Sequence, residues 1–165
     1  MKKILQLLLF LLMVSVNAQK KKELRLLLKK HNNESIPYIT VNELKKELSK
    51  VILLDAREPI EFKVSHIKNT LSVGYNHFNI QNTVSLIKNK NAKVIVYCSI
   101  GIRSEDIAEE LKKAGFLNIY NLYGGIFEWK NKENIVISNE NKLTEQIHVY
   151  SKEWGKWLLK GKKVY

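Results

Sequence analysis

The sequence predicts an α/β fold with an open parallel sheet and helices on both faces. Short runs of β-branched and aromatic residues alternate with longer runs of helical spacing, which is typical of βαβ units. Two of the short runs, residues 51–54 and 94–97, are apolar throughout, as expected of parallel strands that are buried on both sides. In such folds ligands bind beyond the carboxyl ends of the strands.

The first half of the domain has clear start signals for its elements. A short strand is expected at residues 38–39, and Thr40 with Glu43 forms a capping box for the next helix. The strand at 51–54 ends at Asp55, and Pro59 suits the first turn of a short helix. A minor strand at 71–73 and a helix with its core at 83–87 complete this half.

The second half begins with the strand at 94–97, which leads directly into Cys98. From Ser104 onward, apolar residues recur at helical spacing until Gly115, which suits a helix end because glycine readily adopts positive φ. We expect the last strand at 119–122. A short helix that carries Phe127 and Trp129 follows it.

The first residues have the order of a secretory signal peptide. Two lysines precede a mostly apolar run over residues 4–16, and small residues at Val16 and Ala18 suit cleavage near Ala18. The run is short for a membrane span. We therefore expect residues 1–18 to be removed and the protein to be exported, to a periplasm or outside the cell. A permanent, uncleaved anchor is the alternative.

The remaining chain has the length of one domain with one hydrophobic core. We divide it into a basic lead-in helix or arm at 19–36, the α/β domain at 37–131 and a C-terminal extension at 132–165. Loss of the two signal lysines lowers the net charge from +12 to +10. The other lysines are scattered and form no nucleic-acid-reading motif, so we expect a solvated basic surface and no nucleic-acid partner. Attraction of small anions or of an anionic membrane surface is the alternative.

The C-terminal extension carries Tyr150, Trp154 and Trp157 among lysines. Such an aromatic set is expected to pack back on its own domain. Peripheral contact with a membrane surface or with a partner protein is the second interpretation, because tryptophan and lysine together suit an interface.

Cys98 is the only cysteine of the chain, so it has no internal disulfide partner. It is an inert buried thiol, a partner in an intermolecular disulfide, or a reactive group, and its position favours the last. The helix N-terminus that follows it stabilises an anion, Gly101 allows the loop to turn its N–H groups inward, and Arg103 adds a permanent positive charge. These effects favour the nucleophilic thiolate and would hold a persulfide anion in the same place.

Three separated stretches resemble the single-domain rhodaneses, a family of sulfurtransferases that carry a sulfane sulfur on an active-site cysteine. The resemblance covers about residues 38–129. The stretches are Leu54-Asp55-Ala56-Arg57-Glu58-Pro59 with Glu61-Phe62 and His66-Ile67, then residues 94–104, then Gly115-Phe116 with Asn121-Leu122-Tyr123-Gly124-Gly125 and Trp129.

The resemblance implies that Cys98 forms the persulfide and that the loop after it holds the sulfur. That loop consists of Ser99, Ile100, Gly101, Ile102, Arg103 and Ser104. Asp55 and Arg57 match the family's D-x-R-E segment, as a structural salt bridge with a strand-end cap or in a direct catalytic role. His66 matches the family's G/S-H-I turn, where it either holds the turn by a hydrogen bond or takes part in the site.

The length of the loop separates related families on this fold. Four residues lie between Cys98 and Arg103, whereas related phosphatases and arsenate reductases have five, and Tyr97 stands where the phosphatases have histidine. Many thiosulfate-using members also have a second basic residue in the loop. This loop has only Arg103, flanked by Ile100 and Ile102, so an organic persulfide or a partner protein's thiol should fit better than thiosulfate.

The leading hypothesis is an exported sulfurtransferase. It takes a sulfane sulfur from thiosulfate or a persulfide onto Cys98 and passes it to a thiol, including a protein thiol, or to a cyanide-like nucleophile. No metal and no organic cofactor is expected. The second hypothesis is a non-turnover binding or redox-partner module that meets other exported proteins through its basic face and its extension. The intact Cys98–Arg103 loop argues against the second.

Overall fold

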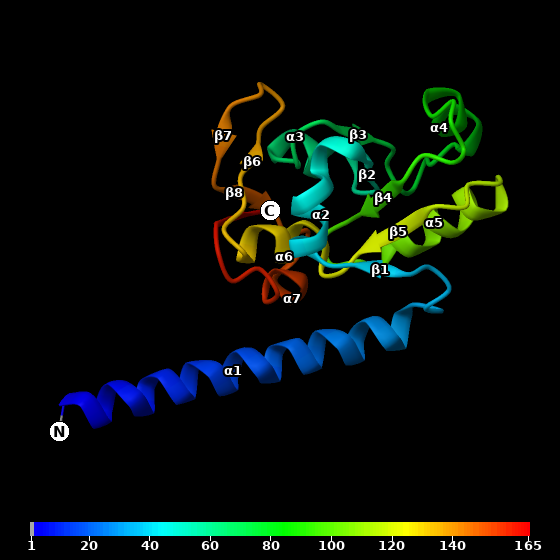
Figure 1. Cartoon of the computed structure of the whole chain (residues 1–165). Coiled ribbons are helices and arrows are strands. Elements are labelled where there is room, and N and C mark those ends of the chain that lie inside the picture. The colour runs from blue at the N-terminus through cyan, green and yellow to red at the C-terminus, as the bar shows by residue number, and fades with distance from the viewer. Residues whose placement is uncertain (1) are drawn as a thin grey trace. The chain divides into compact units, whose positions relative to one another are not determined.

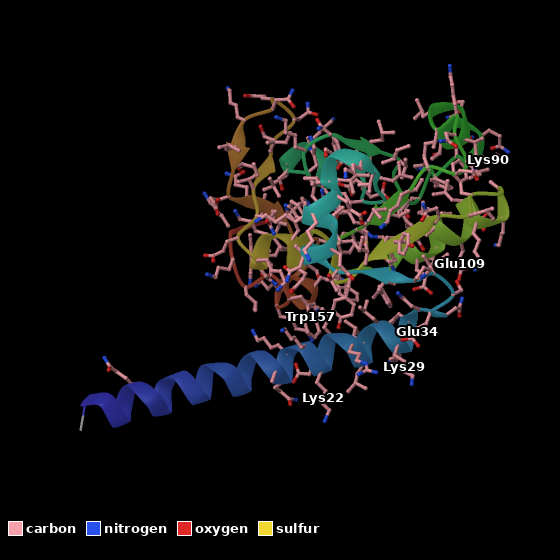
Figure 2. All side chains as sticks on the ribbon, viewed as in Figure 1. Lys22, Lys29, Glu34, Lys90, Glu109 and Trp157 are labelled. Atoms are coloured by element: carbon pink, nitrogen blue, oxygen red, sulfur yellow. The ribbon has the colours of Figure 1, made fainter. Side chains whose placement is uncertain are left out.

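The computed structural model describes residues 2–165, with the side chains of residues 2–5 and 7–17 excepted. The chain forms two compact units, Met1–Asn32 and Asn33–Tyr165. The first unit is a single helix, α1 (Lys2–His31), where the sequence predicts a signal segment and a separate lead-in. Met1 and most side chains of the predicted signal lie outside the described residues. Lys22 and Lys29 project from α1 (Figure 2). Among the described residues, no helix is long and apolar enough to cross a membrane.

The second unit is built on a five-stranded parallel sheet in the order β1-β5-β4-β2-β3 (Figure 1). The strands are β1 (Tyr38–Ile39), β2 (Ile52–Asp55), β3 (Thr70–Ser72), β4 (Val94–Tyr97) and β5 (Ile119–Leu122). Central β4 pairs with β2 through Leu54 and Val96, and with β5 through Val96 and Asn121. The predicted open parallel sheet is confirmed.

Helices cover both faces of this sheet. They are α2 (Val41–Glu47), α3 (Pro59–Val64), α4 (Ile80–Leu86), α5 (Arg103–Lys113) and α6 (Gly125–Asn131). On one face, Leu54 and Val96 belong to a buried apolar cluster with Ile107 and Leu111 of α5. The alternate strand residues, Leu53, Ile95 and Tyr97, point to the opposite face and are equally buried.

Capping explains where the short helices begin. Thr40 and Glu43 form the predicted capping box, with the Thr40 N–H donating to the Glu43 carboxylate at 2.9 Å. The helix predicted around 83–87 begins earlier, at Ile80, because the Asn79 side chain accepts the Asn82 N–H at 2.9 Å. A 3₁₀ turn, Leu48–Lys50, follows α2 directly.

The C-terminal extension folds back on this unit. It contains an antiparallel pair, β6 (Val136–Ile137) and β7 (Leu143–Thr144), a parallel pair, β8 (Gln146–His148) and β9 (Lys162–Val164), and the short helix α7 (Lys152–Gly155). Asn131 of α6 fixes the extension by donating to the Trp157 carbonyl at 2.9 Å and accepting the Leu159 N–H at 2.7 Å. Strand β8 packs against α3. The extension therefore takes the first of the two interpretations, packing on its own domain.

Candidate active site

Cys98 lies at the carboxyl end of β4, where the chain turns into α5. Its residue exposure is only 2%. The Gly101 N–H donates a hydrogen bond to Sγ at 3.1 Å, and the Ser104 hydroxyl lies 3.5 Å from the same sulfur. Gly101 has a φ of 109°, a backbone conformation that side-chain-bearing residues rarely adopt, and this conformation turns its amide toward the sulfur. The loop therefore directs the Gly101 N–H at Sγ, close to the N-terminus of α5.

A buried side chain from the neighbouring strand holds the loop in this shape. Asn121 of β5 donates from Nδ2 to the Gly101 carbonyl at 2.8 Å, and its Oδ1 accepts the Ser104 hydroxyl at 2.8 Å. Asn121 is fully buried, so these bonds replace its contacts with water. In the sequence, Asn121 appears only within a stretch that resembles the family, and nothing local indicates this role.

Helix α6 holds the loop from the other side. The Ile126 and Phe127 N–H groups donate to the carbonyls of Cys98 and Ser99 at 2.9 and 3.1 Å. Gly125 makes this approach possible, because a Cβ at this position would lie 2.3 Å from the Cys98 carbonyl oxygen. The Gly124-Gly125 pair thus has a packing function at the active loop.

The sequence predicts that Arg103 adds a positive charge to the loop. In the structure the charge of Arg103 is paired with a carboxylate and is not free to act on the sulfur. Its guanidinium forms two bonds with the buried carboxylate of Glu61, at 2.7 and 2.9 Å, and a third with the Ser99 hydroxyl at 3.1 Å. The Ser99 hydroxyl in turn donates to Glu61 at 3.2 Å. Glu61 comes from α3, and its closeness to Arg103 follows from the fold rather than from any local motif.

The charges of this pair are strongly stabilised by each other. Burial by itself raises the pKa of Glu61, but the hydrogen bonds and charge of Arg103, aided by Arg57, outweigh it and hold that pKa below its usual range. Burial lowers the pKa of Arg103, while Glu61 and the Cys98 sulfur raise it by more. The pair is therefore ionised, and most of the Arg103 charge is balanced within the protein.

This arrangement predicts a pH-dependent contribution from Glu61. Because its folded-state pKa is lowered, the contribution is present above the ordinary value of 4.5 and is lost as the pH falls through the lower folded-state value. Glu61→Gln should reduce the free energy of unfolding by about 2 kcal/mol at neutral pH, and the difference should shrink at acidic pH. Denaturant unfolding at both pH values measures it. Glu140→Gln, at an exposed ion pair, is the control, and a pH-independent difference would contradict the prediction.

Asp55 and Arg57 form a separate buried pair beneath the sheet end. Their side chains are 0% exposed, and Arg57 lies 2.6 Å from the Asp55 carboxylate and 2.6 Å from the Ser65 carbonyl. Burial lowers the pKa of Arg57, but the Asp55 charge and hydrogen bonds outweigh it. Neither residue lines the pocket described below. The geometry corresponds to a salt bridge that ties the β2 end to the turn after α3.

Breaking that pair should affect stability far more than chemistry. Asp55→Asn keeps the shape but leaves the Arg57 charge buried without its counter-charge, and should cost about 3 kcal/mol of unfolding free energy. The rate of Cys98 modification in the remaining folded protein should change little. Glu110→Gln removes an exposed ion pair with Lys113 and serves as the control, with an expected cost below about 0.5 kcal/mol. Equal costs for the two variants would contradict this account.

His66 also lies away from the sulfur. Its ring stacks on Phe62, with centroids 3.8 Å apart, and its Nδ1 lies 3.1 Å from the Phe62 carbonyl oxygen. Its backbone pairs with Ile137 of the extension. The structure thus brings the loop residues together around Cys98 and leaves Asp55, Arg57 and His66 outside the pocket lining.

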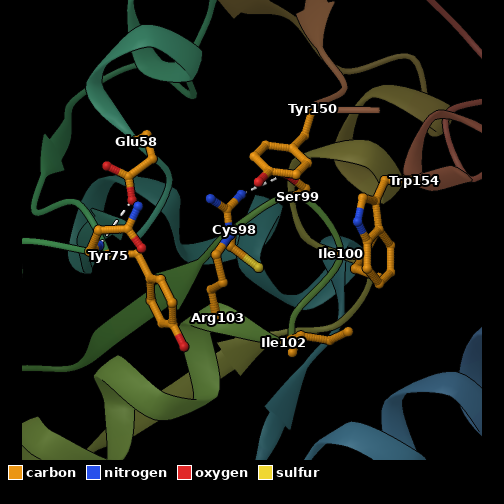
Figure 3. A pocket seen from close by; sticks show the side chains of 10 residues that line it. Glu58, Tyr75, Cys98, Ser99, Ile100, Ile102, Arg103, Tyr150 and Trp154 are labelled. Carbon is orange, nitrogen blue, oxygen red and sulfur yellow. Dashed lines mark hydrogen bonds between the residues drawn. The ribbon is translucent and has the colours of Figure 1, made fainter. Parts of the chain in front are cut away.

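A pocket of about 260 Å³ opens onto Cys98 (Figure 3). In this view Tyr75 and Trp154 lie on opposite sides of the sulfur, and Tyr150 lies above it. No motif in the sequence marks Tyr75, Tyr150 or Trp154 as residues of the site. The lining comprises Glu58, Tyr75, Asn76, Cys98, Ser99, Ile100, Ile102, Arg103, Tyr150 and Trp154. Within the described part of the chain, no cluster of three or more histidine, cysteine or acidic side chains could hold a metal ion.

The comparison with protein families agrees with this geometry. Residues 40–132 match the rhodanese-like domain, so the chain belongs to the rhodanese-like family. Among solved structures, a rhodanese-related protein from Thermoplasma volcanium is 28% identical, with 61% of this chain and 97% of that chain covered and a TM-score of 0.53. A thiosulfate sulfurtransferase from Pseudomonas aeruginosa shares the fold at 20% identity and a TM-score of 0.60, over 84% of this chain and 26% of that one.

Curated relatives match over only part of this chain. A tRNA uridine(34) hydroxylase from Aster yellows witches'-broom phytoplasma is 36% identical over 84 residues, which is 48% of this chain and 27% of the relative. The enzyme of the same name from Hamiltonella defensa is 33% identical over 102 residues, 60% of this chain and 28% of the relative. The chain thus spans about a quarter of the length of these relatives.

Proposed function

We propose that this protein is a sulfurtransferase that carries a sulfane sulfur on Cys98. The observation that carries the proposal is the Sγ of Cys98 at the base of a pocket, within 3.1 Å of the Gly101 N–H and at the N-terminal end of α5. An amide that points at a sulfur anion, with the partial positive charge of a helix N-terminus, stabilises a thiolate and equally a persulfide. Membership of the rhodanese-like family supports the same chemistry.

The proposed reaction has two displacement steps. The Cys98 thiolate attacks the outer sulfur of a donor R–S–SH, the S–S bond of the donor breaks, and R–S⁻ leaves and takes up the proton. The products are R–SH and the Cys98 persulfide anion. An acceptor thiolate then attacks the outer sulfur of that persulfide, which transfers the sulfur and regenerates the Cys98 thiolate. With thiosulfate as donor, the leaving group is sulfite.

The name of the curated relatives suggests a different reaction, on a tRNA uridine. This chain covers only about a quarter of the length of those relatives. The described pocket is small and contains one cation, Arg103, which is already bound by Glu61. These features favour a small sulfur donor over a polyanionic RNA.

Intact-protein mass spectrometry tests the proposal directly, because Cys98 is the only cysteine. The reduced protein is incubated with thiosulfate, inorganic hydrodisulfide or an organic persulfide. The expected result is a gain of one sulfur atom that a thiol acceptor then removes. No gain with any of the three donors would exclude this function and would favour the non-turnover binding module.

We further propose that the protein acts after export, with residues 1–18 removed. The support is the order of two lysines, a mostly apolar run and the small residues Val16 and Ala18. The mass and N-terminal sequence of the protein recovered from the producing cells test this. A mature chain that begins near Gln19 is expected, and recovery of the intact chain from the cytoplasm would contradict it.

A further inference from the structure

The pocket at Cys98 is completed by residues from outside the matched family region. The rhodanese-like match ends at residue 132, yet Tyr150 and Trp154 of the C-terminal extension line the pocket (Figure 3). Together with Ile100 and Ile102 of the loop they give the entrance an apolar and aromatic lining. The extension therefore alters what can reach the sulfur.

The two aromatic residues are held on a buried support. Val149, next to Tyr150, is fully buried, and Tyr150 itself has a left-handed backbone with a φ of 64°. Its N–H donates to Nδ1 of His148 at 3.1 Å. Left-handed backbone is unfavourable for a residue as large as tyrosine, so the surrounding structure must hold it. The backbone at Tyr150 is thus held in place, and the residue lines the pocket although it is 65% exposed.

Trp154 is fixed by its own short helix. Ser151 caps α7 by accepting the Trp154 N–H at 3.5 Å, and Gly155 packs against Val149, where a Cβ would come within 3.2 Å of its side chain. The indole therefore stands at the pocket without a further rearrangement of the extension.

The charges at the pocket disfavour a small dianion. Arg103 is the cation of the lining, and Glu61 already binds it through both oxygens. Glu58 adds a carboxylate to the lining and is fixed there by accepting the Asn76 N–H at 2.9 Å. A thiosulfate dianion that enters the pocket would find Arg103 already paired with Glu61, and would lie close to the Glu58 carboxylate and the Cys98 sulfur. An uncharged organic group instead gains contact with the aromatic rings.

We propose that Tyr150 and Trp154 form a donor-selecting wall of the active site, which favours a small persulfide with an apolar organic group over thiosulfate. This inference rests on the proposed sulfur transfer to Cys98 and specifies its donor class. The organic group lies against the wall while the outer sulfur reaches Sγ. The bond changes are those of the first displacement step, with R–SH as the released product.

The test compares donors on the purified full-length protein. The second-order rate of Cys98 persulfide formation is measured with benzyl persulfide, thiosulfate and inorganic hydrodisulfide. Wild-type protein should react fastest with benzyl persulfide. The double variant Tyr150→Asn with Trp154→Ala should lose about tenfold of the benzyl rate, relative to the other two donors. Asparagine is chosen because it tolerates the left-handed backbone at this position.

Leu159→Ala is the matched control, since Leu159 is an exposed apolar residue of the same extension outside the pocket. It should leave all three rates unchanged. An unchanged benzyl-to-thiosulfate ratio in the double variant, or a wild-type preference for thiosulfate, would overturn the wall while leaving sulfur transfer intact. Absence of persulfide with all three donors would instead overturn the proposed function itself. If the double variant fails to fold, Tyr150→Asn alone provides the same comparison.

Discussion

Cys98→Ser should abolish sulfur uptake, with a fall of more than about 10³-fold in the rate of transfer from donor to acceptor. The hydroxyl that replaces the thiol is a far weaker nucleophile at neutral pH and forms no persulfide. The fold should persist, because serine is close in size and can still accept the Gly101 N–H that now binds Sγ at 3.1 Å. Intact-protein mass spectrometry and a coupled transfer assay measure both parts.

The single cysteine makes this experiment unambiguous, since any sulfur on the wild-type protein must lie on Cys98. Ser104→Ala is the informative companion variant. It removes one hydroxyl at 3.5 Å from Sγ but keeps the nucleophile and the Gly101 amide, so uptake should slow without disappearing. Undiminished sulfur transfer by Cys98→Ser would exclude Cys98 as the carrier. Unfolding of Cys98→Ser would instead reveal a structural demand for the thiol.

The central sheet could be predicted because its signals are local. Continuous apolar runs at residues 51–54 and 94–97 mark β2 and β4, and Thr40 with Glu43 marks a helix start within four residues. The strand-to-helix passage at Cys98 follows from the same local order, and this passage places the sulfur at a helix N-terminus. These parts of the site required no knowledge of distant contacts.

The partners of the loop could not be predicted in this way. Glu61 meets Arg103 from 42 positions away, and Asn121 meets Gly101 from 20 positions away. In the sequence, Glu61 belongs to a stretch that resembles the family and lies in the first turn of a six-residue helix, and neither fact points to Arg103. Its effect on the site is nevertheless large, because it balances the charge that the sequence analysis had assigned to the sulfur.

The strands of the extension and its contribution to the pocket could not be predicted, for a different reason. Its strands have two or three residues each, too few for a recognisable period. Tyr150 adopts positive φ although tyrosine carries no turn signal. Only tertiary packing against α3 and α6 brings it and Trp154 to the pocket. The donor-selecting wall is thus a property of the fold and has no motif of its own.

Gly125→Ala should lower the stability of the protein more than any other proposed substitution. Its Cβ would lie 2.3 Å from the Cys98 carbonyl oxygen and 2.6 Å from that of Ser99, so backbone must move. The positive φ of 53° adds strain. We expect a loss of about 4 kcal/mol or more in unfolding free energy. Sulfur uptake by the folded fraction should also slow, because the displaced loop no longer aims the Gly101 amide at Sγ.

Gly115→Ala is the control that separates the steric clash of a new Cβ from the backbone strain of a positive φ. Gly115 has a similarly positive φ of 92°, but a Cβ there would approach only the flexible end of Lys90, at 3.4 Å. Gly115→Ala should therefore lower the free energy of unfolding only by the backbone strain, about 1–2 kcal/mol, and should leave sulfur uptake unchanged. Denaturant unfolding and the rate of Cys98 persulfide formation distinguish the two variants. If Gly125→Ala proved no worse than Gly115→Ala in both measurements, the contact of α6 with the loop carbonyls would not be what holds Cys98 in position.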